Sequence, residues 1–285
     1  MKILVIGASG MLGSTVLRVL SEKSEWDVLG TVRDGRVRDL LPPPLADCLI
    51  DGIDVLDEDV LPSVLGRIRP DVVINCAGLT KHQPETDEVL VSIPINTLMP
   101  HRLAKYCSLL GARLIHVSTD CVFSGEKGGY VESDVPDATD LYGRSKALGE
   151  VVYANTVTLR TSIIGHELQG TSRYLLSWFL SQEASCKGYT RAVFSGLPTV
   201  IFARVVRDVV IPDPELSGLI HVAAKPIAKY DLLGLLADVY GKSIDIVPDD
   251  GVVIDRSLDA GRFHDATGYV APEWEEMIRM MHAYE

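Results

Sequence analysis

The residues best suited to chemistry in this sequence are Tyr142 and Lys146, which lie four residues apart in the segment Asp-Leu-Tyr-Gly-Arg-Ser-Lys. On a helix this spacing places both side chains on one face. A phenol has a pKa of about 10, and a neighbouring ammonium favours the phenolate and lowers that pKa. None of the other nine tyrosines has a lysine four residues later. The pair is therefore a candidate acid for the reduction of a carbonyl group.

The N-terminal segment predicts a nucleotide-binding turn. An apolar run at residues 2–6 leads to Gly7, Gly10 and Gly13, and a helical apolar pattern follows at residues 11–21. A strand, a glycine turn and a helix start in this order bring backbone N–H groups and the helix dipole to a pyrophosphate. Glycines also let the backbone approach the ligand closely. We therefore expect a dinucleotide cofactor at this turn.

Length and composition limit the class of protein. A chain of 285 residues can form one large α/β domain, or one domain with a smaller appendage. No apolar stretch reaches about 18 residues, and the first predicted strand is too short for a signal peptide, so we expect a cytoplasmic protein without a membrane partner. The five cysteines form no Cys-x-x-Cys pair and the seven histidines are scattered, which favours reduced thiols and predicts no metal site.

The net charge of −12 and the isoelectric point near 5.0 argue against a nucleic-acid partner, because such binding depends on clustered lysine and arginine side chains. An anionic small molecule would need local positive charge from a few arginines and from helix N-termini. The composition therefore leaves an anionic small-molecule substrate open.

Strand-like and helical runs alternate along most of the chain. This alternation predicts an α/β fold with a doubly wound parallel Rossmann sheet, whose ligands lie at the carboxyl ends of the strands. The predicted strands cover residues 2–6, 27–32, 48–50, 71–75, 113–118, 157–163 and 218–223. The predicted helices cover residues 11–21, 57–67, 96–109 and 141–154, and Leu41-Pro-Pro-Pro-Leu45 is expected to be a surface loop.

Two segments, residues 168–196 and 226–285, interrupt the alternation and are rich in Trp, Tyr, Arg and Pro. We expect them to form a smaller α/β substrate-binding lobe that closes over the substrate. The expected Rossmann domain then comprises residues 1–167 together with residues 197–225.

Four motifs give the sequence a resemblance to a known family. They are Gly7-x-x-Gly10-x-x-Gly13, Asn75-Cys-Ala-Gly78, Ser118-Thr-Asp-Cys-Val-Phe-Ser-Gly125 and Tyr142-Gly-Arg-Ser-Lys146-Ala-Leu-Gly-Glu150. With these motifs the chain resembles an extended short-chain dehydrogenase/reductase, and within that superfamily the dTDP-4-dehydrorhamnose reductase group. Enzymes of this group reduce the C4 ketone of a nucleotide-linked 6-deoxyhexulose. The likeness is close through about residue 165 and looser beyond it.

The resemblance implies three catalytic residues. In such reductases the nicotinamide hydride goes to the ketone carbon, and the tyrosine, here Tyr142, protonates the oxygen. Lys146 would lower the Tyr142 pKa and hydrogen-bond the nicotinamide ribose, and Thr119 would hold the carbonyl oxygen in line with Tyr142. Asp120 would contact sugar hydroxyls or cap the next turn.

The resemblance also implies a cofactor site. Arg33 ends the second strand, where an NAD-preferring enzyme usually has an acid for the ribose 2′-hydroxyl. An arginine there suits a 2′-phosphate, although Asp34 follows it, so we expect NADP(H) to be preferred with NAD(H) as the alternative. Asp54 should reach the adenine amino group. The expected cofactor-binding residues are Gly7, Ser9, Gly10, Met11, Leu12, Gly13, Arg33, Asp54, Asn75, Ala77, Gly78, Tyr142 and Lys146.

The expected substrate is a nucleotide sugar. Cys121 and Ile163 stand where the group usually carries a tyrosine and a tryptophan, which leaves more room beside the sugar ring. Thr15 replaces a carboxylate that in some members helps to bind a metal at a dimer interface. We therefore leave a homodimer open, without grounds for the metal-bridged form. The expected substrate-binding residues are Lys81, Thr119, Asp120, Cys121, Ile163, Arg191 and Arg256, with Arg262 as a further candidate for the diphosphate.

Together these features predict an NADP(H)-dependent reductase of a nucleotide-linked 4-keto-6-deoxyhexose, which would serve deoxysugar supply for surface polysaccharide. A sugar-nucleotide epimerase or dehydratase of the same superfamily is one alternative, in which the bound nicotinamide is regenerated in each cycle. A non-catalytic, NADP-binding regulatory subunit is another, because the same fold and even the Tyr-Lys pair occur in one such protein.

Overall fold

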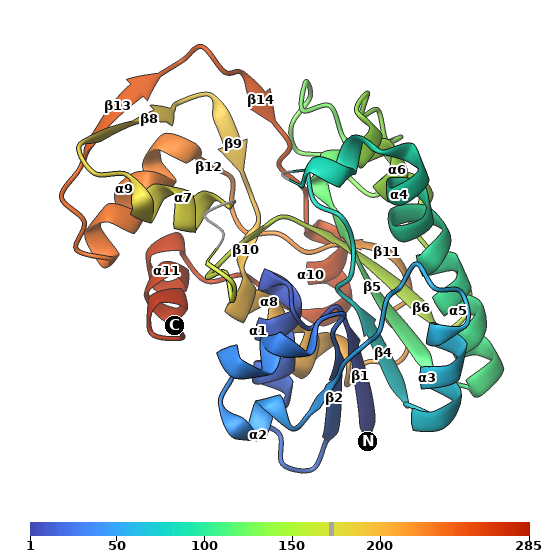
Figure 1. Cartoon of the computed structure of the whole chain (residues 1–285). Coiled ribbons are helices and arrows are strands. Elements are labelled where there is room, and N and C mark those ends of the chain that lie inside the picture. The colour runs from blue at the N-terminus through green and yellow to red at the C-terminus, as the bar shows by residue number, and fades with distance from the viewer. Residues whose placement is uncertain (82, 171–173) are drawn as a thin grey trace.

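The computed structural model describes residues 1–81, 83–170 and 174–285, and it confirms the predicted α/β fold (Figure 1). The strands of the central parallel sheet are β1 (Lys2–Ile6), β2 (Asp27–Thr31), β3 (Leu49–Ile50), β4 (Val72–Asn75), β5 (Arg113–Thr119), β6 (Thr156–Thr161) and β11 (Gly218–His221). Their order is β11-β6-β5-β4-β1-β2-β3. The direction of the order changes between β1 and β4, and in such sheets the ligand lies beyond the carboxyl ends of the strands at that point.

Helices bury both faces of this sheet (Figure 1). Side chains alternate between faces along a strand, so in β1 Leu4 and Ile6 pack with one layer of helices and Ile3 and Val5 with the other. A strand that is buried on both faces is apolar throughout, which explains the run Ile-Leu-Val-Ile. The first layer contains α3 (Val60–Ile68), α4 (Val89–Ser92), the π-helix η3 (Ile93–Leu98), α5 (Met99–Leu110) and α6 (Leu141–Leu148), and the second contains α1 (Met11–Leu20) and α8 (Thr199–Val205).

The smaller lobe contains short strands and helices. In it β9 lies between β12 and β14, and β8 pairs with β13. Its elements are α7 (Leu175–Ser181), β8 (Ser185–Tyr189), β9 (Ala192–Phe194), β12 (Ile227–Ala228), α9 (Lys229–Val239), β13 (Asp245–Asp249), β14 (Ile254–Asp255) and α11 (Trp274–His282). The remaining short elements are η1 (Gly35–Leu40), α2 (Pro43–Ala46), η2 (Pro84–Asp87), η4 (Asp120–Val122), β7 (Ile163–Ile164), β10 (Leu197–Pro198), the π-helix η5 (Val206–Val210) and α10 (Gly261–Thr267).

One hydrophobic cluster passes through both the central sheet and the smaller lobe. It joins Ile3 of β1 and Phe202 of α8 to Leu232 of α9 and Met277 of α11. The helix α10, which belongs to the segment expected in the lobe, packs against β11 of the central sheet. The division into two domains at the boundaries given above stays a prediction.

Two helices differ from the prediction. The helix expected over residues 141–154 ends at Leu148, and the following Gly149 packs so closely on η3 that an added Cβ would lie 1.9 Å from the Asn96 carbonyl oxygen. The helix α8 was not expected. Six of its seven residues are buried, so its sequence lacks the polar face that marks a surface helix.

Two shorter segments also differ. The expected loop at residues 41–45 contains α2, which begins at a proline, the residue that best tolerates the first helical position. The strand expected over residues 157–163 ends at Thr161, and Ile163 instead pairs with Leu197 in the short ladder of β7 and β10.

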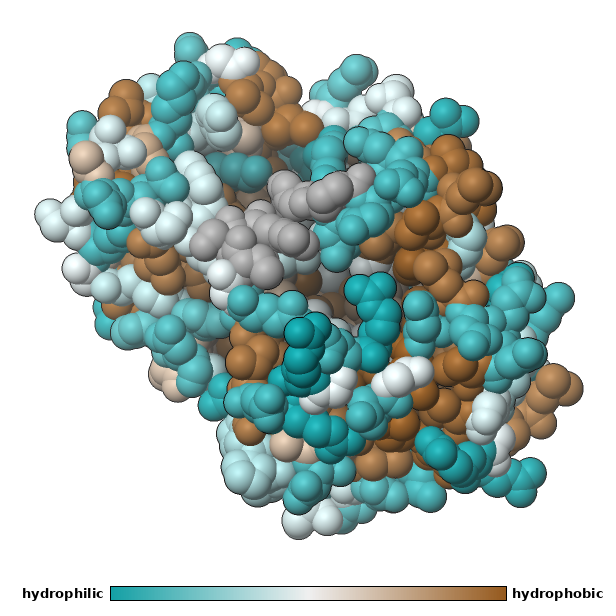
Figure 2. Space-filling view, viewed as in Figure 1, coloured by the Kyte–Doolittle hydropathy of each residue, from teal (hydrophilic) through white to brown (hydrophobic). Residues whose placement is uncertain are grey.

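Exposed apolar side chains gather on the side of the molecule formed by α4, α5 and α6, where Figure 2 shows a hydrophobic area. Leu90, Leu109 and Leu148 are 88%, 84% and 63% exposed. The homodimer left open above stays a prediction. In the described ranges no helix is both long and apolar enough to span a bilayer.

Candidate active site

The glycine turn after β1 leaves no room for side chains. Gly7 has a φ of 84°, in the left-handed region that favours glycine, and an added Cβ would lie 2.8 Å from the Ala77 Cα atom. At Gly13 an added Cβ would lie 2.1 Å from the Gly7 carbonyl oxygen. Gly10 caps α1 without a side-chain hydrogen bond. The bare helix start and the missing side chains form a cradle that fits a pyrophosphate.

The other residues expected at the turn lie on the same stretch of chain. Ser9 is half-buried in the turn itself, and Met11 and Leu12 are buried in the first turn of α1. Because the Met11 and Leu12 side chains pack inward, their contact with a phosphate would come from the backbone N–H groups.

The end of β4 is held by the Asn75 side chain. Asn75 is fully buried, its Nδ2 donates to His116 Nδ1 at 3.0 Å, and its Oδ1 accepts the Ala77 N–H at 3.1 Å. Both ends of this amide are thus used to shape the loop after β4. Ala77 and Gly78 are the loop residues that this arrangement presents beside the glycine turn.

Asn96 of η3 ties the loop after β4 to α6. Its Oδ1 accepts the Leu79 N–H at 2.9 Å, and its Nδ2 donates to Ser145 Oγ at 3.2 Å. This contact brings Gly78 so close to α6 that an added Cβ would lie 3.9 Å from Lys146 Nζ. The cofactor turn and the Tyr-Lys helix therefore meet at Gly78.

Lys146 is buried at this meeting point. Its Nζ donates to the Val117 carbonyl oxygen at 2.9 Å. Burial lowers the Lys146 pKa to about 8, although Glu150 and, to a smaller extent, Cys76 act in the opposite direction. The lysine thus changes its charge close to neutral pH.

A buried ion pair includes Glu150, whose carboxylate acts on Lys146. Arg160 Nη2 contacts Glu150 Oε2 at 2.6 Å, and Arg160 Nε donates to Glu150 Oε1 at 2.7 Å. Ser118 Oγ donates to the same carboxylate at 2.7 Å, and the Arg160 Nη1 lies 3.2 Å from His221 Nε2. The two charged side chains are only 2% and 8% exposed, so each depends on the other for compensation.

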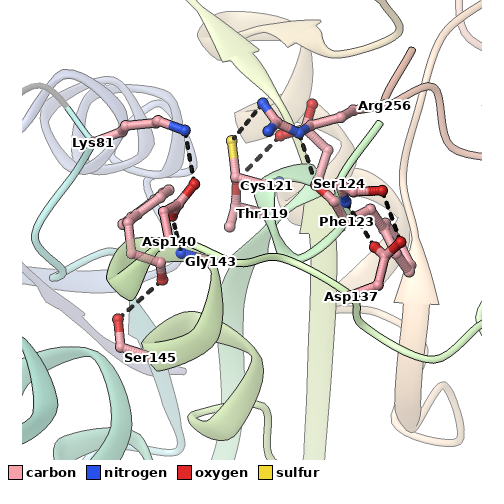
Figure 3. A network of polar contacts seen from close by, with 12 residues as sticks. Lys81, Thr119, Cys121, Phe123, Ser124, Asp137, Asp140, Gly143, Ser145 and Arg256 are labelled. Atoms are coloured by element: carbon pink, nitrogen blue, oxygen red, sulfur yellow. Dashed lines mark hydrogen bonds and ion pairs between the residues drawn. The ribbon is translucent and has the colours of Figure 1, made fainter. Parts of the chain in front are cut away.

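The first turn of α6 packs directly against η4. An added Cβ at Gly143 would lie 2.2 Å from the Cys121 carbonyl oxygen, which explains why glycine follows Tyr142. Asp140 caps the helix by accepting the Gly143 N–H at 2.8 Å, and it also pairs with Lys81 at 2.8 Å (Figure 3). Lys81 therefore lies at the start of α6, where its ammonium is already paired with a carboxylate.

The close packing of α6 on η4 brings Thr119 to Tyr142. Thr119 Oγ1 accepts the Cys121 N–H at 3.1 Å and donates to Asp120 Oδ1 at 3.1 Å. Its hydroxyl also favours the ionised form of Tyr142 by hydrogen bonding. Thr119, Tyr142 and Lys146 are thus brought together at the carboxyl end of β5.

The structure corrects the expectation for the pKa of Tyr142. Burial raises the pKa of this phenol well above its ordinary value, and Cys121 acts in the same direction while Thr119 opposes them. The ammonium of Lys146, which we expected to lower this pKa, donates to the Val117 carbonyl instead. Tyr142 therefore keeps its proton at neutral pH, as a proton donor must before it reacts.

Asp120 and Cys121 directly follow Thr119, and together they form a wall beside the cluster of Thr119, Tyr142 and Lys146. Burial raises the pKa of the Asp120 carboxyl, whereas the Arg256 guanidinium and a hydrogen bond with Ser162 favour its charged form. Arg256 reaches the wall from the smaller lobe, donating from Nε to the Phe123 carbonyl at 2.8 Å and placing Nη1 3.9 Å from Cys121 Sγ (Figure 3). The structure therefore brings Arg256 to the expected substrate side.

The other expected substrate residues take different positions. Ile163 follows directly after Ser162 and is half-buried against the main hydrophobic cluster. Arg191 is exposed just before β9, and its role stays a prediction. Arg262 donates from Nη1 to the Leu219 carbonyl at 3.1 Å on the edge strand β11, and its role at the diphosphate stays a prediction. Local sequence patterns could not predict the contact between Arg262 and β11.

The residues expected at the adenosine end follow β2 and β3. Arg33 is exposed after β2 and has no hydrogen bond or ion pair with any residue the structure describes. The adjacent Asp34 bonds instead to Arg36, whose hydrogen bond lowers the Asp34 pKa to about 2. Asp54 is half-buried after β3 and accepts the Leu56 N–H at 3.0 Å. Arg33 is therefore left as the free cation at the end of β2.

Sequence reasoning missed Lys229. This lysine is half-buried as the first residue of α9, close enough to Asp120, Cys121 and Arg256 for all three to act on its pKa. Cations are unfavourable at a helix N-terminus, so a lysine at that position is a signal that the sequence does contain.

The lowered pKa of Lys146 predicts opposite pH effects on activity and stability. As the pH rises through about 8, Lys146 loses its proton, so we expect kcat/KM to fall above that value. Between that pH and the ordinary lysine pKa of 10.5 the unfolded chain binds more protons than the folded chain, so this group makes the free energy of unfolding rise with pH. Lys146→Arg, which keeps its charge, should lack both effects. An activity limb that appears only near 10.5 in the wild type would contradict the assignment.

A glycine cradle, a strand-end threonine and a buried Tyr-Lys pair around one edge of a doubly wound sheet define an extended short-chain dehydrogenase/reductase. The chain belongs to the family described as RmlD substrate binding domain, whose model matches residues 1–184, and with it to the dTDP-4-dehydrorhamnose reductase group.

Comparison with known proteins gives relatives of two kinds. The methionine adenosyltransferase 2 subunit beta of Xenopus laevis is 28% identical over 256 residues, covering 83% of this chain and 71% of the relative. A probable low-salt glycan biosynthesis reductase of Haloferax volcanii is 29% identical over 267 residues, covering 90% and 83%. The solved dTDP-4-dehydrorhamnose reductase of Bacillus anthracis in complex with NADP has a TM-score of 0.82 at 19% identity, covering 100% of this chain and 98% of that one. At this identity the solved structure shows the fold alone.

Proposed function

We propose that the chain is an NADP(H)-dependent reductase of the C4 ketone of a nucleotide-linked 4-keto-6-deoxyhexose. The observation that carries the proposal is the meeting of Thr119, Tyr142 and Lys146 beside the glycine cradle, with Gly78 at the contact. NADPH, when bound, supplies the hydride for the carbonyl carbon. Membership in a family of reductases and the NADP complex of a solved neighbour support this cofactor.

The chain's own residues supply the proton and the alignment. Tyr142 holds its proton at neutral pH and transfers it to the carbonyl oxygen, which becomes the hydroxyl of the product. The Thr119 hydroxyl, which donates to Asp120 Oδ1 in this structure, would turn to hold the same oxygen. Lys146 offers an ammonium beside Gly78, where it would bond the ribose and compensate the phenolate that Tyr142 leaves. Gly7 and Gly13 let the turn pack closely on Ala77 and on itself, and the N–H groups of this turn and of the start of α1 would bind the pyrophosphate.

The substrate is tested by following NADPH absorbance against dTDP-, UDP- and GDP-linked 4-keto sugars. Cys121 and Ile163 are smaller than the aromatic residues usual in the group, so dTDP-4-dehydrorhamnose is expected to be accepted without being the best substrate. Such changes in pocket shape discriminate by only about 1–3 kcal/mol. Absence of turnover with every 4-keto-6-deoxy sugar would remove the reductase proposal.

A second candidate function rests on the relatives named methionine adenosyltransferase 2 subunit beta. In this reading the chain binds NADP(H) but serves as a non-catalytic regulatory subunit. A stable partner enzyme in pull-downs, together with no NADPH turnover, would favour it. The epimerase or dehydratase alternative predicts instead that the nicotinamide cofactor stays bound through purification.

Arg33→Ala is expected to weaken the binding of NADPH selectively. If Arg33 pairs with the 2′-phosphate, the loss of a charge-assisted hydrogen bond costs about 1.5–3 kcal/mol, or about 10- to 150-fold in Kd. NADH lacks this phosphate and should bind as before. Titration of both cofactors measures the effect, and Arg67→Ala, at an exposed arginine of α3, is the matched control. An equal loss for both cofactors would mean that Arg33 is only structural.

A further inference from the structure

Lys229 and Arg256 directly follow the two outer strands of the three-stranded sheet in the smaller lobe. The strand β9 pairs on one side with β12, where Ala228 lies opposite Val193, and on the other with β14, where Asp255 lies opposite the same Val193. Lys229 and Arg256 are the next residues after these two partners. Strands lie about 4.8 Å apart, so two long side chains that flank one central strand can reach a common point.

That common point is the wall beside Thr119. Arg256 bonds the Phe123 carbonyl through Nε at 2.8 Å, and its Nη1 approaches Cys121 Sγ at 3.9 Å (Figure 3). Lys229 lies within electrostatic reach of Asp120, Cys121 and Arg256. Both cations therefore lie close to Asp120 and Cys121, the two residues that follow Thr119.

Neither cation of this pair has a contact ion pair among the residues that the structure describes. Lys229 and Arg256 are both half-buried, and within the described ranges neither lies in a salt bridge with a carboxylate. Asp120 acts on both cations, although burial disfavours its charged form. Asp137 and Asp140 act on Arg256 but not on Lys229. Lys229 also stands at the positive end of α9, which raises the cost of its charge. An anion bound between Lys229 and Arg256 would stabilise the charged forms of both side chains.

We propose that Lys229 and Arg256 together bind an oxyanion of the substrate, which makes Lys229 a specificity-determining residue. The inference rests on the proposed function, because it takes the substrate to be a nucleotide sugar. The oxyanion can come from the diphosphate of the nucleotide or from a carboxylate on the sugar. Both present oxygen acceptors that suit an ammonium and a guanidinium.

The test measures binding, so it does not depend on turnover. Titrations of dTDP-glucose, UDP-glucose and UDP-glucuronate are compared between wild type, Lys229→Met and Lys229→Arg, with NADPH binding as a check on folding. Lys225→Met is the matched control, because Lys225 is exposed and pairs with Glu273 at the surface. Lys229→Met is expected to raise Kd about 10- to 100-fold, and Lys229→Arg is expected to restore most of the affinity.

The probes distinguish the two sources of the oxyanion. A similar loss for all three nucleotides identifies the diphosphate, whereas a loss confined to UDP-glucuronate identifies a sugar carboxylate. If Lys229→Met changes the Kd of the nucleotides by less than about twofold, as Lys225→Met is expected to, the inference is overturned and the proposed function stands. A wild type that binds NADPH but none of the three nucleotides overturns the proposed substrate class and the inference with it.

Discussion

Tyr142→Phe lowers kcat by at least about 10²-fold in the expected result, while NADPH still binds. The substitution keeps the shape and apolar area of the side chain and removes only the hydroxyl that would give its proton to the carbonyl oxygen. Turnover of the best substrate from the nucleotide-sugar panel is the measurement, and a cofactor titration shows that the site is otherwise intact.

The chain offers a matched control for this prediction. Tyr153 is exposed, and its hydroxyl bonds His101 Nδ1 at 2.9 Å outside the site. Tyr153→Phe should leave kcat unchanged. Equal rates for the Tyr142→Phe variant and the wild type would show that Tyr142 only packs in α6.

Glu150→Ala is expected to cost about 3–5 kcal/mol of the free energy of unfolding. The substitution leaves Arg160, which is 2% exposed, without its carboxylate partner in the core. Urea unfolding followed by circular dichroism measures the loss. Glu275→Ala is the control, because Glu275 pairs with Arg279 on the surface of α11, where such pairs contribute at most about 1 kcal/mol. A loss for Glu150→Ala as small as that of the control would show that Arg160 finds another partner.

The sequence predicted the parts of the site that local patterns encode. Gly7, Gly10 and Gly13 follow an apolar strand directly. Tyr142 and Lys146 both lie in the helix α6, as their spacing of four residues predicted. Parallel strands also bring their carboxyl ends to one edge of the sheet, so residues at those ends were expected to lie together.

The rest depends on contacts between distant segments. Arg256 reaches Cys121 only because β9 pairs with β14, and no short pattern fixes that register. The direction of the Tyr142 pKa follows from burial and from the Val117 carbonyl that takes up Lys146, neither of which the sequence displays. Lys229 carried no motif; its unfavourable place at the start of α9 was the signal in the sequence, and its neighbours Asp120 and Arg256 show where it lies.

The hydrophobic cluster that joins Ile3 of β1 to Leu232 of α9 and Met277 of α11 has a consequence for motion. Because both parts of the molecule bury side chains in one core, neither can swing on a hinge as a rigid body without opening that core to water. The closure over a substrate that we expected of the whole smaller lobe would then fall to side chains such as Arg256 and to the loops around them. We expect the two parts to lose their structure together on heating, as one cooperative unit.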